Sequence, residues 1–330
     1  MRRYELIGRQ DLRLREDVET PRPGTGEVLV RVGSNSVCNR SDLAYYHYYG
    51  LRDHCATGCF GHEIAGSVEA VGDGVHRIQP GERVFVRTPL TSGYADFALA
   101  REIAVGRLPD DVAFEQGSAL QLLPLAVHAT RGVRLGDRVA IVGQGPVGLM
   151  ALQVAKLRGA ADVTVFDLDE WRLARSSELG ADRIVHNKPG ADPAGELAGE
   201  FDVAIEAVGT PGTANACVRL VRQAGLVVFL GTHHVDTHVT FDMVAWEKKG
   251  LRIHTSAEPT DEARADAMRT AQRLIDAGRI RLAELTTHVF PLSDLPKAID
   301  LLSASRTLAP EGEEIYAGPP RRVLKVAVVP

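Results

Sequence analysis

The stretch from Val139 to Asp167, VAIVGQGPVGLMALQVAKLRGAADVTVFD, constrains the fold of this chain more than any other. It begins with the apolar run Val139–Val142, which is typical of a buried parallel strand. Three glycines with the spacing G-x-G-x-x-G follow, then an apolar-periodic segment at 147–157 that predicts a helix, and a second strand at 163–166. A strand, a glycine-rich turn, a helix and a second strand are the opening unit of a doubly wound parallel sheet.

Each position of this motif has a physical reason in a dinucleotide site. Gly143 permits a tight turn after the strand, Gly145 lets the backbone approach a pyrophosphate, and Gly148 lets the helix pack close to the sheet. The start of the helix, at Pro146 and Val147, presents unpaired N–H groups and a partial positive charge to phosphates. The motif therefore predicts that these five residues contact a dinucleotide.

Asp167 stands at the end of the second predicted strand, where a carboxylate can accept hydrogen bonds from an adenosine ribose diol. A ribose 2′-phosphate would be repelled by the same carboxylate, so the residue favours NAD(H) over NADP(H). The alternative is a surface turn between strand and helix without a ligand. Because the flanking strand, the helix and the acid all meet the requirements of the motif, we favour the cofactor site.

Composition limits the classes of protein to which the chain can belong. At 330 residues it is longer than a usual domain, which favours two domains. A net charge of −5 without a basic stripe argues against a nucleic-acid partner, and no apolar run approaches the roughly 20 residues of a membrane span. The N-terminus does not resemble a signal peptide, and four cysteines form no disulfide framework, so we expect a cytoplasmic protein.

The pattern of predicted elements divides the chain in three. Residues 1–126 contain short strands between turn signals, which predicts a barrel-like β domain. Residues 127–256 alternate strands and helices, among them a helix at Ala214–Gln223 capped by Gly225. Residues 257–330 predict a long helix and a last strand that return to the first domain. The expected fold class is α/β, with a Rossmann doubly wound sheet and a separate β domain.

The segment Gly61-His62-Glu63-Ile64-Ala65-Gly66, with Gly72 downstream, has the spacing G-H-E-x2-G-x5-G. With this motif beside the glycine loop, the chain resembles the zinc alcohol and polyol dehydrogenase branch of the medium-chain dehydrogenase/reductase superfamily, nearly end to end. The resemblance implies a GroES-like catalytic domain at 1–126 and 257–330 and a Rossmann domain at 127–256. It also implies hydride transfer between NAD(P) and an alcohol or carbonyl in the cleft between these domains.

The same resemblance implies a catalytic zinc held by Cys38, His62 and Glu63. The run Cys38-Asn39-Arg40-Ser41-Asp42 has one residue more than the family pattern, so Cys38 or Asn39 can occupy the first ligand position. Cys59, three residues before His62, is a possible substitute ligand.

Two features of the sequence speak against zinc. Leu123 stands where polyol dehydrogenases carry a glutamate, and the four-cysteine structural-zinc lobe is missing between Gly81 and Gly93. In the alternative without metal, Cys38 is a small buried apolar residue and His62 is a hydrogen-bonded histidine. Zinc and a metal-free site therefore both remain open at this point.

Ser41 takes the position of the family's proton-relay hydroxyl, and His47, inside the run Tyr45-Tyr46-His47-Tyr48-Tyr49, is a candidate to continue the relay. Packing of this aromatic run against a substrate is the interpretation that we favour for it. Without zinc, Ser41, His62 or a tyrosine would have to act as the general acid.

Further cofactor contacts follow from the resemblance. Arg40 matches a residue that reaches the pyrophosphate, and Arg172 matches a basic contact to the adenosine ribose, with an exposed helix charge as its alternative. Val208 and Leu230, each after a predicted strand, match the nicotinamide half of the site, as does Thr232 beyond them.

We therefore expect an NAD-dependent dehydrogenase that acts on a secondary hydroxyl of a polyol, sugar or cyclitol-like compound. Its partners would be a small alcohol or ketone and further copies of the chain, in a homodimer or homotetramer joined through the edge strand of the Rossmann sheet. The alternatives are a metal-free NAD(P)H-dependent carbonyl or enone reductase and a non-catalytic NAD-binding protein.

Overall fold

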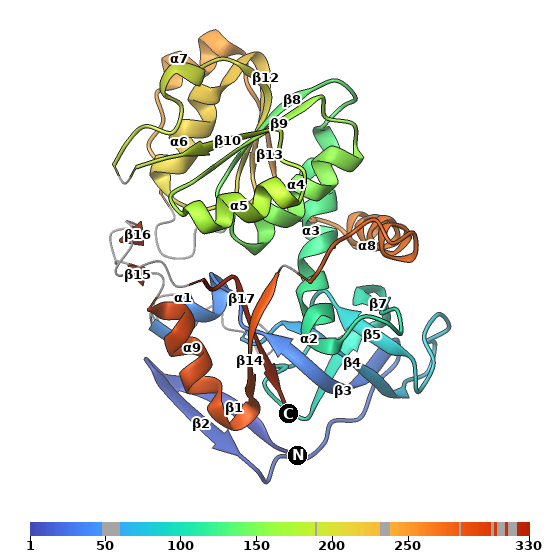
Figure 1. Ribbon diagram of the computed structural model, residues 1–330. Coiled ribbons are helices and arrows are strands. Elements are labelled where there is room, and N and C mark those ends of the chain that lie inside the picture. The colour runs from blue at the N-terminus through green and yellow to red at the C-terminus, as the bar shows by residue number, and fades with distance from the viewer. Residues whose placement is uncertain are drawn as a thin grey trace. The chain divides into compact units, whose positions relative to one another are not determined.

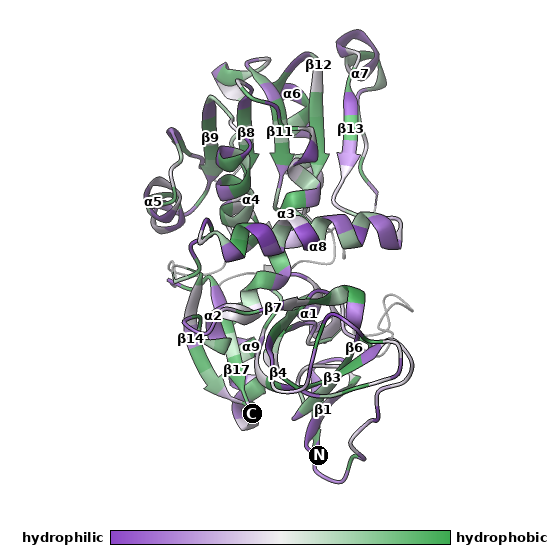
Figure 2. Ribbon diagram, turned by 90° about the vertical axis from the view of Figure 1, so that its right-hand side faces the viewer, coloured by the Kyte–Doolittle hydropathy of each residue, from purple (hydrophilic) through white to green (hydrophobic). Residues whose placement is uncertain are grey.

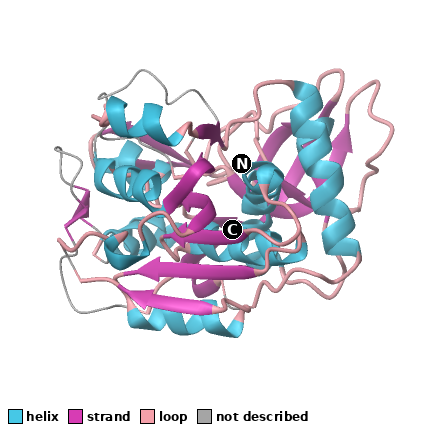
Figure 3. Cartoon of the chain, turned by 90° about the horizontal axis from the view of Figure 1, so that it is seen from above, coloured by secondary structure: helices cyan, strands magenta, loops and turns pink. Residues whose placement is uncertain are grey.

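The computed structural model describes residues 1–47, 60–188, 190–231, 238–283, 285–304, 307–308, 314–315 and 322–330. The chain forms two compact units, which are coloured along the sequence in Figure 1. Unit 1 comprises Met1–Pro124, Pro259–Thr307 and Tyr316–Pro330, and unit 2 comprises Leu125–Glu258 and Leu308–Ile315. Both units mix helices and strands (Figure 3), so the expected α/β class is confirmed.

Unit 2 contains a six-stranded sheet whose neighbouring strands are all parallel. Its order is β10 (Arg183–His186), β9 (Asp162–Asp167), β8 (Arg138–Val142), β11 (Phe201–Glu206), β12 (Val221–Phe229) and β13 (Arg252–Thr255). Numbered along the chain this is the order 3-2-1-4-5-6, which is one of the orders of the doubly wound parallel sheet that the sequence predicts. The strand order reverses between β8 and β11, and ligands of such sheets bind at the carboxyl ends of the strands beside this point.

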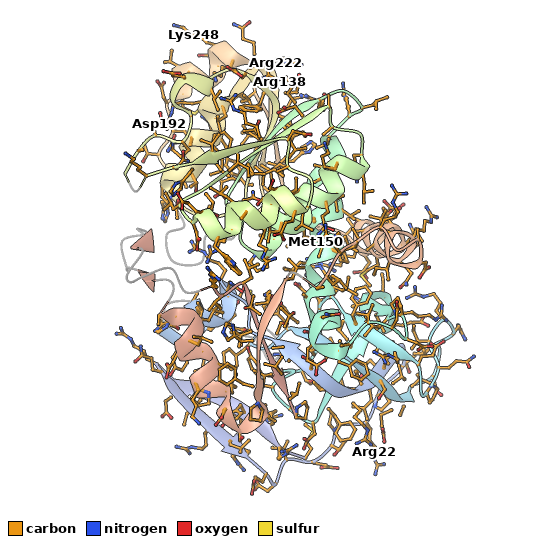
Figure 4. All side chains as sticks on the ribbon, viewed as in Figure 1. Arg22, Arg138, Met150, Asp192, Arg222 and Lys248 are labelled. Atoms are coloured by element: carbon orange, nitrogen blue, oxygen red, sulfur yellow. The ribbon has the colours of Figure 1, made fainter. Side chains whose placement is uncertain are left out.

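Helices connect the parallel strands of unit 2, since parallel neighbours need a crossover. They are α4 (Pro146–Leu157), α5 (Glu170–Glu178), α6 (Pro211–Leu220) and α7 (Met243–Lys249). The central strands are buried on both faces and apolar, whereas the edge strand β13 is largely hydrophilic, which Figure 2 shows by colour. Met150, labelled in Figure 4, lies fully buried on α4.

The predicted end of one helix is wrong. Helix α6 ends at Leu220 and β12 begins at Val221, so the expected cap at Gly225 does not exist. Val221 pairs with Phe201 of β11, and the register then shifts at a bulge where Ala224 has a φ of 55°. Pairing with the sheet therefore outweighs the helical pattern of the segment, and Gly225 serves a close approach within this bulge.

Unit 1 contains a seven-stranded sheet in the order β14 (Thr286–Pro291), β17 (Lys325–Val329), β3 (Glu27–Ser36), β4 (Glu63–Val71), β5 (Arg83–Val86) and β7 (Val105–Arg107), with β6 (Phe97–Arg101) also paired to β3. The C-terminal strand β17 thus lies between β14 and β3, and brings the last residues of the chain beside residues near position 36. Valines and alanines of β3 to β7 form the core of this sheet.

The described part of unit 1 also contains the hairpin of β1 (Arg3–Gly8) and β2 (Asp11–Arg15) and the α-helices α1 (Ser41–His47), α2 (Phe114–Gly117), α8 (Asp261–Asp276) and α9 (Leu295–Ser303). Helix α3 (Leu122–Ala129) begins in unit 1 and ends in unit 2, and the short strands β15 (Thr307–Leu308) and β16 (Glu314–Ile315) pair with each other. Within the described ranges, no helix combines the length and apolar character that a membrane span requires.

Candidate functional site

Cys38, His62 and Glu63 lie together in unit 1, with one ligand atom of each within 4.8 Å of the others. Strand pairing is the reason, because the antiparallel ladder of β3 and β4 places Ser36 opposite Glu63. Cys38 follows the end of β3, and His62 precedes the start of β4, so both meet at the same end of the ladder. The structure thus brings together the three predicted metal ligands.

Asp42 supports this group, and the sequence reasoning assigned it no role. Its carboxylate is fully buried and accepts hydrogen bonds from the N–H of Cys38 at 2.9 Å, the N–H of Gly61 at 3.0 Å and the hydroxyl of Tyr94 at 2.6 Å. It also lies 3.8 Å from Nδ1 of His62. Its place directly after Ser41 in the family-like run was the available signal; nothing in the sequence pointed to Tyr94.

Lys325 is a second residue that the sequence reasoning missed. Its Nζ lies 2.5 Å from Oε1 of Glu63, and both side chains are almost fully buried. The ammonium group also donates to the carbonyl of Val37 at 3.2 Å. The other oxygen of Glu63, Oε2, is buried and has no hydrogen-bond partner among the described residues. The sequence feature that could have pointed to Lys325 is its position as the lone lysine in the otherwise apolar last strand.

The neighbouring charges shift the pKa values of Cys38 and His62 in opposite directions. Burial by itself raises the pKa of the Cys38 thiol, but the charge of His62 and its hydrogen bond outweigh burial, so this pKa lies below its ordinary value. Burial by itself lowers the pKa of His62, but Cys38, Asp42 and Glu63 raise it to about 10. Each of the two side chains therefore favours the charged form of the other.

These residues fit a zinc ion. A thiolate, an imidazole nitrogen and a carboxylate oxygen are donors that zinc takes in proteins, and Oε2 of Glu63 is a buried oxygen that lacks a partner. The amide nitrogen of Asn39 donates to the carbonyl of Leu324 at 2.7 Å, while its Oδ1 is buried without a hydrogen-bond partner among the described residues, so Asn39 stays the alternative to Cys38 at the first ligand position. Leu123 is fully buried and offers no ligand atom. Cys59 lies outside the described residues.

Ser41 begins α1, and its N–H donates to Sγ of Cys38 at 3.4 Å. His47, at the other end of α1, has Nε2 at 2.8 Å from Oγ of Ser303 and Nδ1 at 2.9 Å from the amide of Gln10. Both ring nitrogens therefore have partners in the packing of α1 against its neighbours, and the relay role considered for His47 stays a prediction.

Arg40, the other residue singled out in this segment, is partly buried just before α1. Tyr48 and Tyr49 of the aromatic run lie outside the described residues, so the expected substrate wall stays a prediction.

The glycine loop of unit 2 has the local geometry that its sequence predicts. Gly143 has a φ of 96°, which favours glycine. A Cβ on Gly148 would lie 1.9 Å from the carbonyl oxygen of Gly143, so only glycine allows this approach of helix to strand. Gly145 is the extended N-cap of α4, and Pro146 is its first residue, followed by Val147. The start of this helix therefore presents backbone N–H groups at the carboxyl end of β8.

Asp167 ends β9, and its carboxylate accepts hydrogen bonds from the N–H of Gln144 at 2.6 Å and the N–H of Asp169 at 3.0 Å. It thus connects the second strand to the glycine loop. Arg172 is only 4% exposed, and its Nε lies 3.7 Å from Oδ2 of Asp169. The alternative of an exposed helix charge at Arg172 is therefore wrong.

Val208 and Leu230 follow the carboxyl ends of β11 and β12, on the other side of the point where the strand order reverses. The N–H of Val208 donates to the side chain of Glu206 at 2.9 Å, and the N–H of Leu230 donates to the carbonyl of Glu206 at 2.8 Å. Thr232 lies outside the described residues. The predicted cofactor contacts within unit 2 thus gather at the carboxyl ends of its parallel strands.

Comparison with known proteins agrees with this architecture. Residues 24–110 match the family model of the alcohol dehydrogenase GroES-like domain, and residues 146–273 match that of zinc-binding dehydrogenases. Human sorbitol dehydrogenase is 30% identical over 333 residues, which cover 89% of this chain and 90% of that protein.

Two solved structures have the same fold. A thermostable alcohol dehydrogenase from Pyrobaculum aerophilum has a TM-score of 0.80 at 26% identity, covering 100% of this chain and 99% of its own. Zinc-dependent alcohol dehydrogenase 2 from Streptococcus pneumonia, in its apo form, has a TM-score of 0.80 at 25% identity, covering 92% and 95% of the two chains.

Proposed function

The chain belongs to the zinc-type alcohol and polyol dehydrogenase family of the medium-chain dehydrogenase/reductase superfamily, and on this premise we propose an NAD-dependent oxidation of a secondary hydroxyl group. The protein is an oxidoreductase, and its proposed substrates are polyols, sugars or cyclitol-like compounds. The observation that carries the proposal is the group of Cys38, His62 and Glu63, because it supplies a zinc donor set in a chain of this family.

In the proposed reaction Cys38, His62 and Glu63 hold the metal. When bound, zinc polarises the hydroxyl oxygen of the substrate, and NAD takes up the hydride. Asp42 fixes the loop that carries Cys38 and lies close to His62, so it keeps two of the ligands in place. Lys325 holds Glu63 by one oxygen, which leaves Oε2 for the metal.

Ser41 is the proposed first acceptor of the proton that the alcohol loses. Its position next to Cys38 at the start of α1 supports this role, and a hydroxyl can accept and donate a hydrogen bond at the same time. Arg40 stays a proposed contact to the cofactor pyrophosphate.

Asp167 supports NAD over NADP. Its carboxylate lies at the carboxyl end of β9, next to the glycine loop, where the adenosine ribose binds in doubly wound sheets. Arg172, the basic side chain that we assigned to this half, forms an ion pair with Asp169, in which its Nε lies 3.7 Å from Oδ2.

Metal analysis combined with kinetics tests the proposal. We expect about one zinc ion per chain. With members of a panel of polyols and cyclitols, the protein should reduce NAD but not NADP. Removal of zinc by a chelator should abolish turnover, and Cys38→Ser should lower the zinc content. Activity that survives in zinc-free protein would favour the metal-free reductase. Binding of NADH without turnover of any alcohol or ketone would favour the non-catalytic protein.

A homodimer or homotetramer is also proposed. Strand β13 supports it, because it stands at the end of the parallel sheet and is paired on one side in the described part of the chain. Light scattering of the purified protein measures the assembly, and a monomer at all concentrations would contradict it. A cytoplasmic location stays a prediction from the cysteine content.

A further inference from the structure

Glu206 is the last residue of β11, next to the point where the strand order of the parallel sheet reverses. Its side chain is fully buried, and Oε1 accepts three hydrogen bonds. The donors are the N–H of Val208 at 2.9 Å, the N–H of Gly209 at 2.7 Å and the hydroxyl of Thr213 at 2.7 Å. One carboxylate oxygen thus holds the turn that follows β11 and the first turn of helix α6.

The backbone of Glu206 holds a second turn. Its carbonyl accepts hydrogen bonds from the N–H groups of Leu230 and Gly231, each at 2.8 Å. The two turns also touch, because a Cβ on Gly231 would lie 2.4 Å from the backbone nitrogen of Gly209 and 2.6 Å from Oε2 of Glu206. Side chain and backbone of this one residue therefore connect the carboxyl ends of β11 and β12.

The turn after β11 packs against the glycine loop. A Cβ on Gly143 would lie 2.5 Å from Cγ2 of Val208 and 3.2 Å from the carbonyl oxygen of Ala207. Gly209 has a φ of 90°, which requires glycine in practice, so the turn has a defined shape. Val208 is therefore held between the glycine loop on one side and the carboxylate of Glu206 on the other.

We propose that Glu206 is a positioning residue that shapes the nicotinamide half of the cofactor site. The inference rests on the proposed NAD dependence. In a doubly wound sheet the two halves of a dinucleotide bind on either side of the reversal point, and Asp167 on β9 marks the adenosine side. The turns after β11 and β12 then face the nicotinamide. Hydrogen bonds to a charged acceptor are strong, and a buried carboxylate costs free energy unless such bonds are made.

Binding of NADH and of ADP-ribose distinguishes this role from a general structural one. ADP-ribose lacks the nicotinamide ring but keeps the adenosine, the pyrophosphate and both riboses. Titrations of the full-length protein should show roughly tenfold weaker NADH binding for Glu206→Ala, with ADP-ribose affinity within about twofold of wild type. The NADH affinity of Glu206→Gln should lie between those of wild type and Glu206→Ala, since its amide oxygen can still accept hydrogen bonds from the backbone.

Three further variants make the comparison selective. Glu196→Gln makes the same chemical change at an exposed site of unit 2 and should bind both ligands like wild type. Asp167→Ala should weaken both ligands, because both contain the adenosine ribose. Thr213→Val removes one of the three donors to Glu206 together with the capping contact to the N–H of Thr210. It is the second variant should Glu206→Ala fail to fold, and we expect it to weaken NADH selectively.

Equal losses for NADH and ADP-ribose in the Glu206 and Thr213 variants would overturn the inference, as would unchanged affinity for both. If the wild-type protein binds neither ligand, the proposed NAD dependence itself is wrong, and the inference is wrong with it. If wild type binds NADH, the outcome of the variant series concerns Glu206 alone.

Discussion

Glu63 and Lys325 are 262 positions apart in the chain and form an ion pair that has almost no contact with solvent. Removing either charge from water is costly, and the attraction between the two groups offsets this cost only while both are present. The same contact leaves one oxygen of Glu63 for a metal ion. A single residue of the last strand thus orients a proposed metal ligand.

Loss of Lys325 should therefore destabilise unit 1 strongly. We expect Lys325→Met to lower the free energy of unfolding by about 3 kcal/mol, because Glu63 is left as a buried charge without its partner. The double variant Lys325→Met with Glu63→Gln should recover a large part of this loss. Urea unfolding measures both, with Lys297→Met, an exposed lysine of α9, as the control. A Lys325→Met variant as stable as the control would contradict the role of the pair.

At the scale of elements, the end of α6 shows how a distant side chain completes a helix. The ammonium group of Lys249, the last residue of α7, donates to the carbonyls of Val218, Arg219 and Val221 at 2.7–2.9 Å. The last carbonyls of a helix have no partner inside the helix, and a cation there also interacts favourably with the helix dipole. Lys249 thus provides the cap that the sequence pattern assigned to Gly225.

Replacement of this cap should cost stability without affecting the metal ligands. Lys249→Met should lower the free energy of unfolding of unit 2 by about 1–2 kcal/mol, since up to three carbonyls lose their donor. The neighbouring Lys248, labelled in Figure 4, is exposed, and Lys248→Met is the matched control. Thermal unfolding of both variants makes the comparison. Equal melting temperatures for the two would show that the carbonyls find other partners.

At the scale of the whole molecule, the proposed zinc ligands lie in unit 1, whereas the proposed NAD contacts other than Arg40 lie in unit 2. The zinc ligands and their partners come from three separate segments of unit 1, near Cys38, His62 and Lys325. The proposed NAD contacts from Gly143 to Leu230 all lie in unit 2. A ligand that binds only the folded state stabilises that state according to its concentration and affinity.

Zinc and NADH should therefore protect different parts of the chain. Hydrogen exchange should slow at 60–71 and 322–330 when zinc is added to metal-free protein, and at 138–167 when NADH is added. At a ligand concentration of roughly a thousand times Kd the gain is about 4 kcal/mol. Cys38→Ser should remove the effect of zinc and keep that of NADH. Protection by zinc confined to unit 2 would contradict the assigned metal site.

The sequence alone identified the features that lie close together along the chain. The glycine loop with its flanking strands, Asp167 after the second strand, and the pair His62-Glu63 are local patterns whose spacing already carries their geometry. The parallel sheet followed from the alternation of strands and helices, because the connections of such units obey few topologies. These predictions needed no knowledge of which distant segments meet.

Only the tertiary structure decided which distant residues meet at the site. Lys325 reaches Glu63 because β17 inserts beside β3, and Val221 ends α6 because it pairs with Phe201. Arg172 is buried although it lies on a polar helix. In each case strand pairing or packing in three dimensions outweighs local propensity, and residues separated by tens to hundreds of positions have no spacing from which their contact could be read.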